Sequence, residues 1–125
     1  MEIEVSIGEI LDKITILSIK NSTITDRDKL NNIKKELNHL VQKCYSSGIE
    51  LSTDLYFGLH DVNKQLWDIE DKIREKERRK EFDAEFIELA RSVYMINDRR
   101  SEIKKAINLE YKSSFVEEKS YSKYN

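Results

Sequence analysis

The chain has 125 residues, of which 37% are charged and 38% hydrophobic, with no proline and three glycines. This length fits one domain with its own core, and the composition is typical of long, charge-covered helices. A net charge of −2 argues against general binding to nucleic acid, and no apolar run reaches the roughly 18 residues of a membrane span. We expect a single domain over residues 1–125. We also expect a cytoplasmic protein, because there is one cysteine and the acidic N-terminus lacks a signal peptide's basic region.

The first two predicted helices are short and cover about residues 7–20 and 26–45. Ser6 can cap the first helix, and Glu9, three residues on, completes a capping box. The second helix is expected to end before Gly48, which suits a left-handed cap. Apolar residues recur at helical spacing in both helices (Ile7, Ile10, Ile14 and Leu17 in the first; Leu30, Ile33, Leu37, Leu40 and Cys44 in the second).

Two longer helices are predicted at about residues 53–79 and 83–111. Their apolar residues step by four and three, which keeps side chains on one face of a helix. These residues are Leu55, Leu59, Val62, Leu66, Ile69 and Ile73, then Phe86, Leu89, Val93, Ile96, Ile103 and Ile107. Residues 74–81 between the two series are all charged, and one straight helix would point the series in different directions. A turn near residues 79–82 therefore folds one series onto the other.

The predicted fold is all-α, an antiparallel four-helix arrangement in which the shorter N-terminal hairpin packs across part of the long pair. Residues 112–125 are expected to be irregular. Phe115, Val116, Tyr121 and Tyr124 could fold this segment back onto the helices.

Arg100 occupies a position in the apolar series of the last helix, where a charge has to be explained. Three explanations stay open. The bundle opens there, Arg100 reaches a carboxylate such as Asp61, or another subunit covers it. A polar residue in an apolar seam can also set the oligomeric state.

A second, more polar stripe runs beside each long apolar series and indicates a groove under the N-terminal hairpin. Its residues are Trp67, Glu70, Arg74, Tyr94, Asn97 and Lys104, joined by Asp12 and Lys13 of the first helix. As a ligand site, Arg74 and Lys104 would hold a small anion, Glu70 would act as base or orienting group, and two aromatic residues would form the walls. The alternative, commoner in proteins, is an ion-pair network that only fixes how the hairpins dock.

No pattern in the sequence indicates a cofactor or a metal ion. His39 and His60 lack a second ligand at metal spacing. Glu85 and Glu88 have a spacing similar to that of helical magnesium-dependent nucleotide pyrophosphohydrolases, but a second acidic pair at three-residue spacing is absent.

Several segments resemble an uncharacterised, all-helical bacterial and phage family that is classed as a domain of unknown function. They are residues 6–17, 66–77, 82–94, 97–100 and 116–121. The resemblance covers most of the chain and implies that residues 117–121 belong to the domain. It carries no activity with it.

The leading functional interpretation is a non-enzymatic interaction or assembly module that forms a homodimer or binds another helical protein. Long apolar faces, more helix than a 125-residue core needs, and the lack of a catalytic set support it. The second interpretation is a small helical enzyme or anion-binding protein that uses the groove. A nucleic-acid role ranks third, and no membrane partner is expected.

Overall fold

A computed structural model describes residues 1–120 and 122–124. Within these residues the chain forms four α-helices, α1 (Ile7–Thr23), α2 (Arg27–Ser46), α3 (Asp54–Arg78) and α4 (Ala84–Glu110), and no strand. The prediction of an all-α fold is confirmed, with helix ends within three residues of those expected. None of the described helices combines the length and the apolar character needed to cross a bilayer.

Each helix begins at a polar side chain that accepts a hydrogen bond from the backbone N–H three residues later. The four capping residues are Ser6, Asp26, Thr53 and Asp83. The sequence predicts that α1 ends near residue 20, because the short polar side chains of Ser22 and Thr23 can compete for backbone hydrogen bonds. In the structure their hydroxyls instead donate to the Ile19 carbonyl at 2.9 and 2.8 Å. These bonds stay within the helix instead of competing with it, so α1 continues to Thr23.

The charged run reverses the chain as predicted, since α3 ends at Arg78 and α4 begins at Ala84. Lys80 takes a left-handed conformation with φ of 56° in the turn. Lys76 is buried, and its Nζ lies 2.8 Å from the Asp83 carboxylate and 3.2 Å from that of Glu85. One lysine therefore ties the end of α3 to the start of α4.

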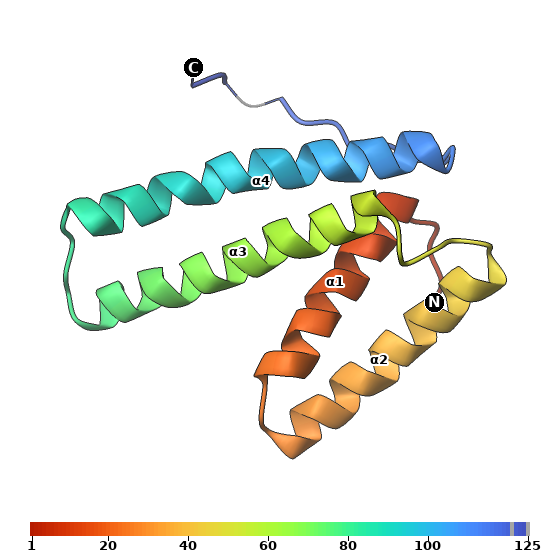
Figure 1. Ribbon diagram of the computed structural model, residues 1–125, viewed down its shortest axis with the longest axis horizontal. Coiled ribbons are helices and arrows are strands. Elements are labelled where there is room, and N and C mark those ends of the chain that lie inside the picture. The colour runs from red at the N-terminus through yellow and green to blue at the C-terminus, as the bar shows by residue number, and fades with distance from the viewer. Residues whose placement is uncertain (121, 125) are drawn as a thin grey trace.

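The helices form two hairpins, α1–α2 and α3–α4, that meet at one end and diverge toward the other (Figure 1). Among the described helices, α1 packs against all three others, whereas α2 packs mainly against α1. The shared end contains the core, in which Leu11, Ile14, Cys44, Leu59, Val62, Ile96 and Ile107 are buried together. The N-terminal hairpin was expected to pack across part of the long helix pair. In the structure α1 makes most of that contact.

The far half of the α3–α4 hairpin, residues 66–94, extends past α1, and we call it the arm. Where α1 covers the long apolar series, Leu59, Val62, Ile96 and Ile107 are buried, and Leu55 and Ile103 are partly buried. Along the arm the same series is only half-buried (Leu66, Ile69, Ile73, Phe86, Leu89 and Val93). Phe82 and Ile87 are 55% and 56% exposed there.

The start of α1 lies unusually close to the end of α4. The Gly8 N–H donates to Asn108 Oδ1 at 2.7 Å, and the Ile7 N–H donates to Ser113 Oγ at 3.2 Å. These bonds satisfy N–H groups in the first turn of α1 that have no partner within the helix. A Cβ atom on Gly8 would lie 2.7 Å from the Lys104 backbone oxygen, so this close approach requires glycine.

We predict that Gly8→Ala lowers the free energy of unfolding by about 1–3 kcal/mol, because the added methyl group pushes α1 away from the α4 backbone. Gly58→Ala is the matched control. Its Cβ would meet only Ile103 Cδ1 at 3.6 Å, an ordinary contact, and alanine favours the helix by up to about 1 kcal/mol. Urea unfolding of both variants checks the prediction, and equal stability of the two would contradict it.

Candidate functional site

The carboxylate of Asp12 on α1 lies at the junction of three helices. Asp12 is 2% exposed. Its Oδ1 accepts hydrogen bonds from Arg100 Nε of α4 at 2.8 Å and from Asn63 Nδ2 of α3 at 2.9 Å, and its Oδ2 pairs with Arg100 Nη2. Asn63 Nδ2 also donates to Thr15 Oγ1 at 2.7 Å. One buried carboxylate therefore connects α1 to both long helices.

The charges at this junction stabilise each other. Burial alone raises the pKa of the Asp12 carboxyl, but the hydrogen bonds from Arg100 and Asn63 and the positive charge of Arg100 outweigh it. The net effect holds the pKa of Asp12 below its ordinary value, so the carboxylate stays ionised. The hydrogen bond to Asp12 likewise raises the pKa of Arg100. A carboxylate buried without such partners would be strongly destabilising.

The position of Arg100 decides between the three explanations that the sequence left open. Arg100 does reach a carboxylate, but the partner is Asp12 on α1 and not Asp61. Asp61 instead accepts a hydrogen bond from Gln65, one turn along the same helix, at 3.0 Å. The Arg100 side chain remains 28% exposed, and its Nη1 lies 3.4 Å from Asn97 Oδ1.

A second group of charges lies one turn further along α4. Lys104 is buried, and its Nζ lies 2.8 Å from Glu9 of α1 and 3.1 Å from Glu117 of the C-terminal segment. Burial lowers the pKa of Lys104, but the two carboxylates raise it more. This arrangement joins the C-terminal segment, α1 and α4.

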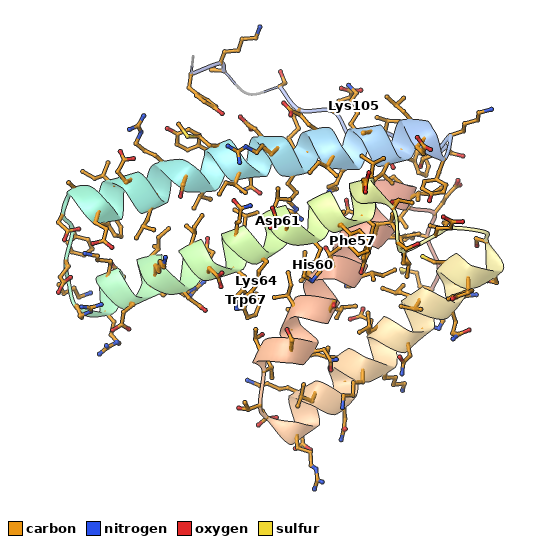
Figure 2. The ribbon with its side chains drawn as sticks, viewed as in Figure 1. Phe57, His60, Asp61, Lys64, Trp67 and Lys105 are labelled. Atoms are coloured by element: carbon orange, nitrogen blue, oxygen red, sulfur yellow. The ribbon has the colours of Figure 1, made fainter. Side chains whose placement is uncertain are left out.

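The C-terminal segment runs back along α4 (Figure 1). Lys105 lies on the side of α4 that faces this segment (Figure 2), and its Nζ lies 3.3 Å from the Glu118 carboxylate. In the segment that the family resemblance placed in the domain, residues 117–121, Glu117 and Glu118 thus contact α4. Tyr121 lies outside the described residues.

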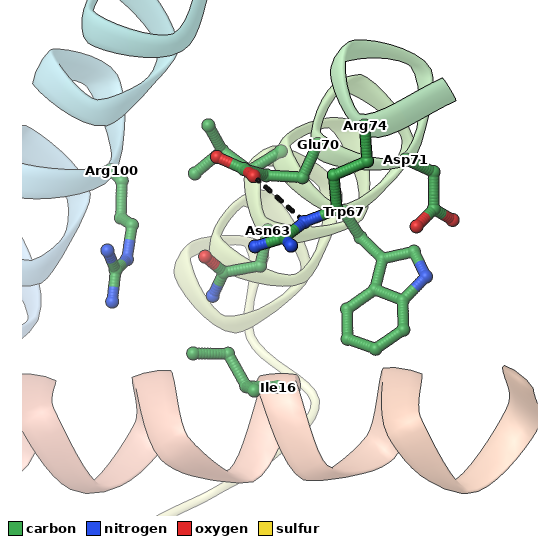
Figure 3. A pocket seen from close by; sticks show the side chains of 8 residues that line it. Ile16, Asn63, Trp67, Glu70, Asp71, Arg74 and Arg100 are labelled. Atoms are coloured by element: carbon green, nitrogen blue, oxygen red, sulfur yellow. Dashed lines mark ion pairs between the residues drawn. The ribbon is translucent and has the colours of Figure 1, made fainter. Parts of the chain in front are cut away.

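A cleft of about 500 Å³ opens where α1 diverges from the arm, and we call it the Trp67 cleft. It brings together three of the predicted groove residues, Trp67, Glu70 and Arg74 (Figure 3). The full lining is Ile16, Asn63, Leu66, Trp67, Glu70, Asp71, Arg74 and Arg100. Arg74 Nε lies 3.7 Å from the Glu70 carboxylate.

The other five predicted groove residues lie elsewhere around Arg100. Tyr94 and Asn97 line a separate cleft of about 490 Å³ between α4 and the C-terminal segment. Asp12 and Lys13 line a smaller one of about 260 Å³ beside α1. Arg100 borders all three clefts, and Lys104 lies in none of these three. The predicted single groove is thus divided by the Arg100 side chain and its bond to Asp12.

The Trp67 cleft is chemically suited to an apolar group with a positive charge nearby. Ile16, Leu66 and Trp67 provide apolar walls. Both cations at its edge already have carboxylate partners, Arg100 with Asp12 and Arg74 with Glu70, and Asp71 adds another negative charge. In the described part of the chain, no three histidine, cysteine or acidic residues come together as metal ligands.

The model of a family described as a family of unknown function, DUF6165, matches residues 1–124. No curated protein and no solved structure matches the chain.

We predict that Arg100→Met costs about 3–5 kcal/mol of unfolding free energy at neutral pH, because it leaves Asp12 buried and ionised without its partner. Arg99→Met, an exposed neighbour on α4, is the control and should stay within about 0.5 kcal/mol of the parent. Urea unfolding at pH 7 measures both.

The same pair predicts a pH dependence. Because the pKa of Asp12 is lower in the folded protein, the pair contributes its stabilisation above the ordinary carboxyl pKa of 3.8 and loses it as the pH falls through the folded value. The difference between parent and Arg100→Met should therefore be largest near pH 7 and shrink toward pH 3. A difference that does not change with pH would contradict the role assigned to Asp12.

Proposed function

The chain belongs to DUF6165, a family of unknown function, and we propose that it is a non-enzymatic assembly module that forms a homodimer through its arm. The observation that carries this proposal is the change in burial along the α3–α4 hairpin. Where α1 covers the hairpin, most of the apolar series is buried. Where α1 ends, every member is only half-buried, and Phe82 and Ile87 beside them are exposed. Apolar side chains gathered on one part of a surface are typical of interaction sites.

The exposed surface continues the face that α1 occupies. On α4, Arg100, Lys104 and Asn108 form hydrogen bonds with α1. Steps of three and four residues along that face lead to Asn97, Val93, Ala90 and Phe86. On α3, the face of Asn63 continues in the same way to Trp67, Glu70 and Arg74. The arm therefore offers a mostly apolar row from α4 beside a row from α3 that carries both signs of charge.

A second copy of the chain is the partner that fits this face best. Two arms packed face to face would complete a four-helix bundle, the arrangement in which amphipathic helices of this length commonly bury their apolar sides. A two-fold interface requires a self-complementary surface. The α3 row meets this requirement, because Glu70 and Arg74 give it both signs of charge, and antiparallel packing of two α3 helices can place opposite signs against each other.

A site for a small anion, the second interpretation of the sequence, is less well supported. Arg74 and Arg100 each have a carboxylate partner, and Asp71 leaves the Trp67 cleft with no surplus of positive charge. Lys104, the other proposed anion-binding group, is bound by Glu9 and Glu117 away from this cleft. We therefore rank assembly above ligand binding.

We propose a cytoplasmic location, which the single thiol of the chain supports. Cys44 is free and buried in the core, and burial raises the pKa of the thiol. A buried thiol with no disulfide partner fits a reducing compartment.

Light scattering coupled to size-exclusion chromatography tests the dimer. We predict twice the mass of 14.8 kDa at micromolar concentration for the parent chain, and the monomer mass for Ala90→Arg. Ala90 is exposed on the arm face, so arginine there introduces a buried charge only in the dimer.

Glu88→Arg is the matched control. It introduces the same residue two positions away in α4, about 200° around the helix, at an exposed site on the opposite side. This variant should remain a dimer. A monomeric parent, or equal behaviour of the two variants, would refute the proposal.

A further inference from the structure

We infer that the Trp67 cleft receives the tip of the arm from a second copy, with Phe82 of that copy in contact with Trp67. We define the arm tip as residues 78–83. The inference rests on the proposed homodimer and adds which surfaces meet. It makes the cleft a site that only the partner copy completes.

The arm tip carries an exposed aromatic group that has little support from its own chain. Phe82 is 55% exposed and makes an edge contact with Phe86, with ring centroids 5.3 Å apart. A phenylalanine at the end of a hairpin, far from the core, gains burial only if another surface covers it. The walls of the cleft, Ile16, Leu66 and Trp67, offer an apolar surface of the kind this ring needs.

Charge is also complementary between tip and cleft. At the tip, the side chains of Arg78 and Lys80 are 70% and 73% exposed, and each pairs with a glutamate of its own α3, Glu75 and Glu77. At the cleft, Asp71 has no ion-pair partner within 4.0 Å in the described part of the chain, and it lies beside Glu70. Exposed basic side chains at the tip and an unpaired carboxylate at the cleft edge favour association of two copies in an antiparallel sense.

The spacing along α3 allows all of these contacts to form at once. Consider two α3 helices packed antiparallel about a two-fold axis. A residue of one copy and a residue of the other face each other when their two numbers add up to a fixed total, and that total defines the register. If Asp71 faces Arg78 of the second copy, Arg74 faces Glu75. Trp67 then lies one helical turn beyond the end of the partner's α3, beside the turn that carries Phe82. Both charged pairs are of opposite sign, and each occurs twice in the dimer.

A charge exchange in the 125-residue chain tests this register. Asp71→Arg and Arg78→Asp should each raise the dimer dissociation constant about tenfold or more, because each places like charges opposite one another twice. The double variant Asp71→Arg/Arg78→Asp restores opposite charges and should bring the constant back to within about threefold of the parent. Analytical ultracentrifugation over a dilution series measures these constants.

Glu88→Arg is also the matched control for Asp71→Arg. It makes the same exchange of an acidic residue for arginine, at an exposed site on the side of α4 opposite the arm face. This replacement should leave the dissociation constant unchanged. Thermal unfolding of each variant confirms that the chain still folds.

Trp67 is the only tryptophan in the sequence, so its fluorescence reports on the cleft directly. We expect the emission of the parent chain to shift to shorter wavelength as dimer forms, and Phe82→Ala to remove most of that shift. A dimer whose Trp67 emission is independent of concentration would overturn the inference. The inference would also be overturned if the double variant had a dissociation constant as high as those of the single variants. Either of these two results would leave the proposed homodimer intact. A chain that stays monomeric would overturn both proposals.

Discussion

The fold depends on a buried carboxylate that three helices share. Asp12 lies on α1, accepts hydrogen bonds from Asn63 on α3 and Arg100 on α4, and is nearly inaccessible to solvent. An ionised group in such a place is tolerated only with its partners in position. The interaction therefore also fixes the geometry of the fold. Asp12 keeps its partners only when α1 has one axial position and one rotation relative to the α3–α4 hairpin.

The position of α1 explains the shape of the molecule and the location of its free surface. Asp12 and Gly8 fix the first half of α1 against the shared end of the two hairpins. Beyond that point α1 and α2 leave the long hairpin, and the arm has no further helix to cover it (Figure 1). The Trp67 cleft lies where this divergence begins. The same contacts that hold the fold together thus create the surface we assign to assembly.

Much of the fold could be predicted from the sequence, because its local signals agree. Apolar spacing, the caps at Ser6 and Asp83, and the charged run before Phe82 each pointed to the helices and the reversal that the structure has. The end of α1 was misjudged because hydroxyl groups can support a helix as well as end it. Whether Ser22 and Thr23 bond back to Ile19 is not encoded in their spacing.

The site was harder to predict, because helical spacing gives the angle of a side chain but not which neighbour approaches it. Trp67, Glu70 and Arg74 lie on one helix, and the structure brings them together in one cleft. The residues expected from α4 depend on how α1 crosses that helix. Asp12 and Glu9 of α1 form ion pairs with Arg100 and Lys104 of α4. These pairs divide the groove, which was predicted from the sequence to be continuous.

The coupling energy between Asp12 and Arg100 tests the central claim most directly. It is obtained from urea unfolding at pH 7 of Asp12→Leu, Arg100→Met, the double variant and the parent chain. If the shared carboxylate holds the helices in place, the double variant should be more stable than the sum of the single effects predicts, by about 1–3 kcal/mol. Single effects that add to within about 0.5 kcal/mol would show that the two side chains stabilise the fold independently, and would contradict the account.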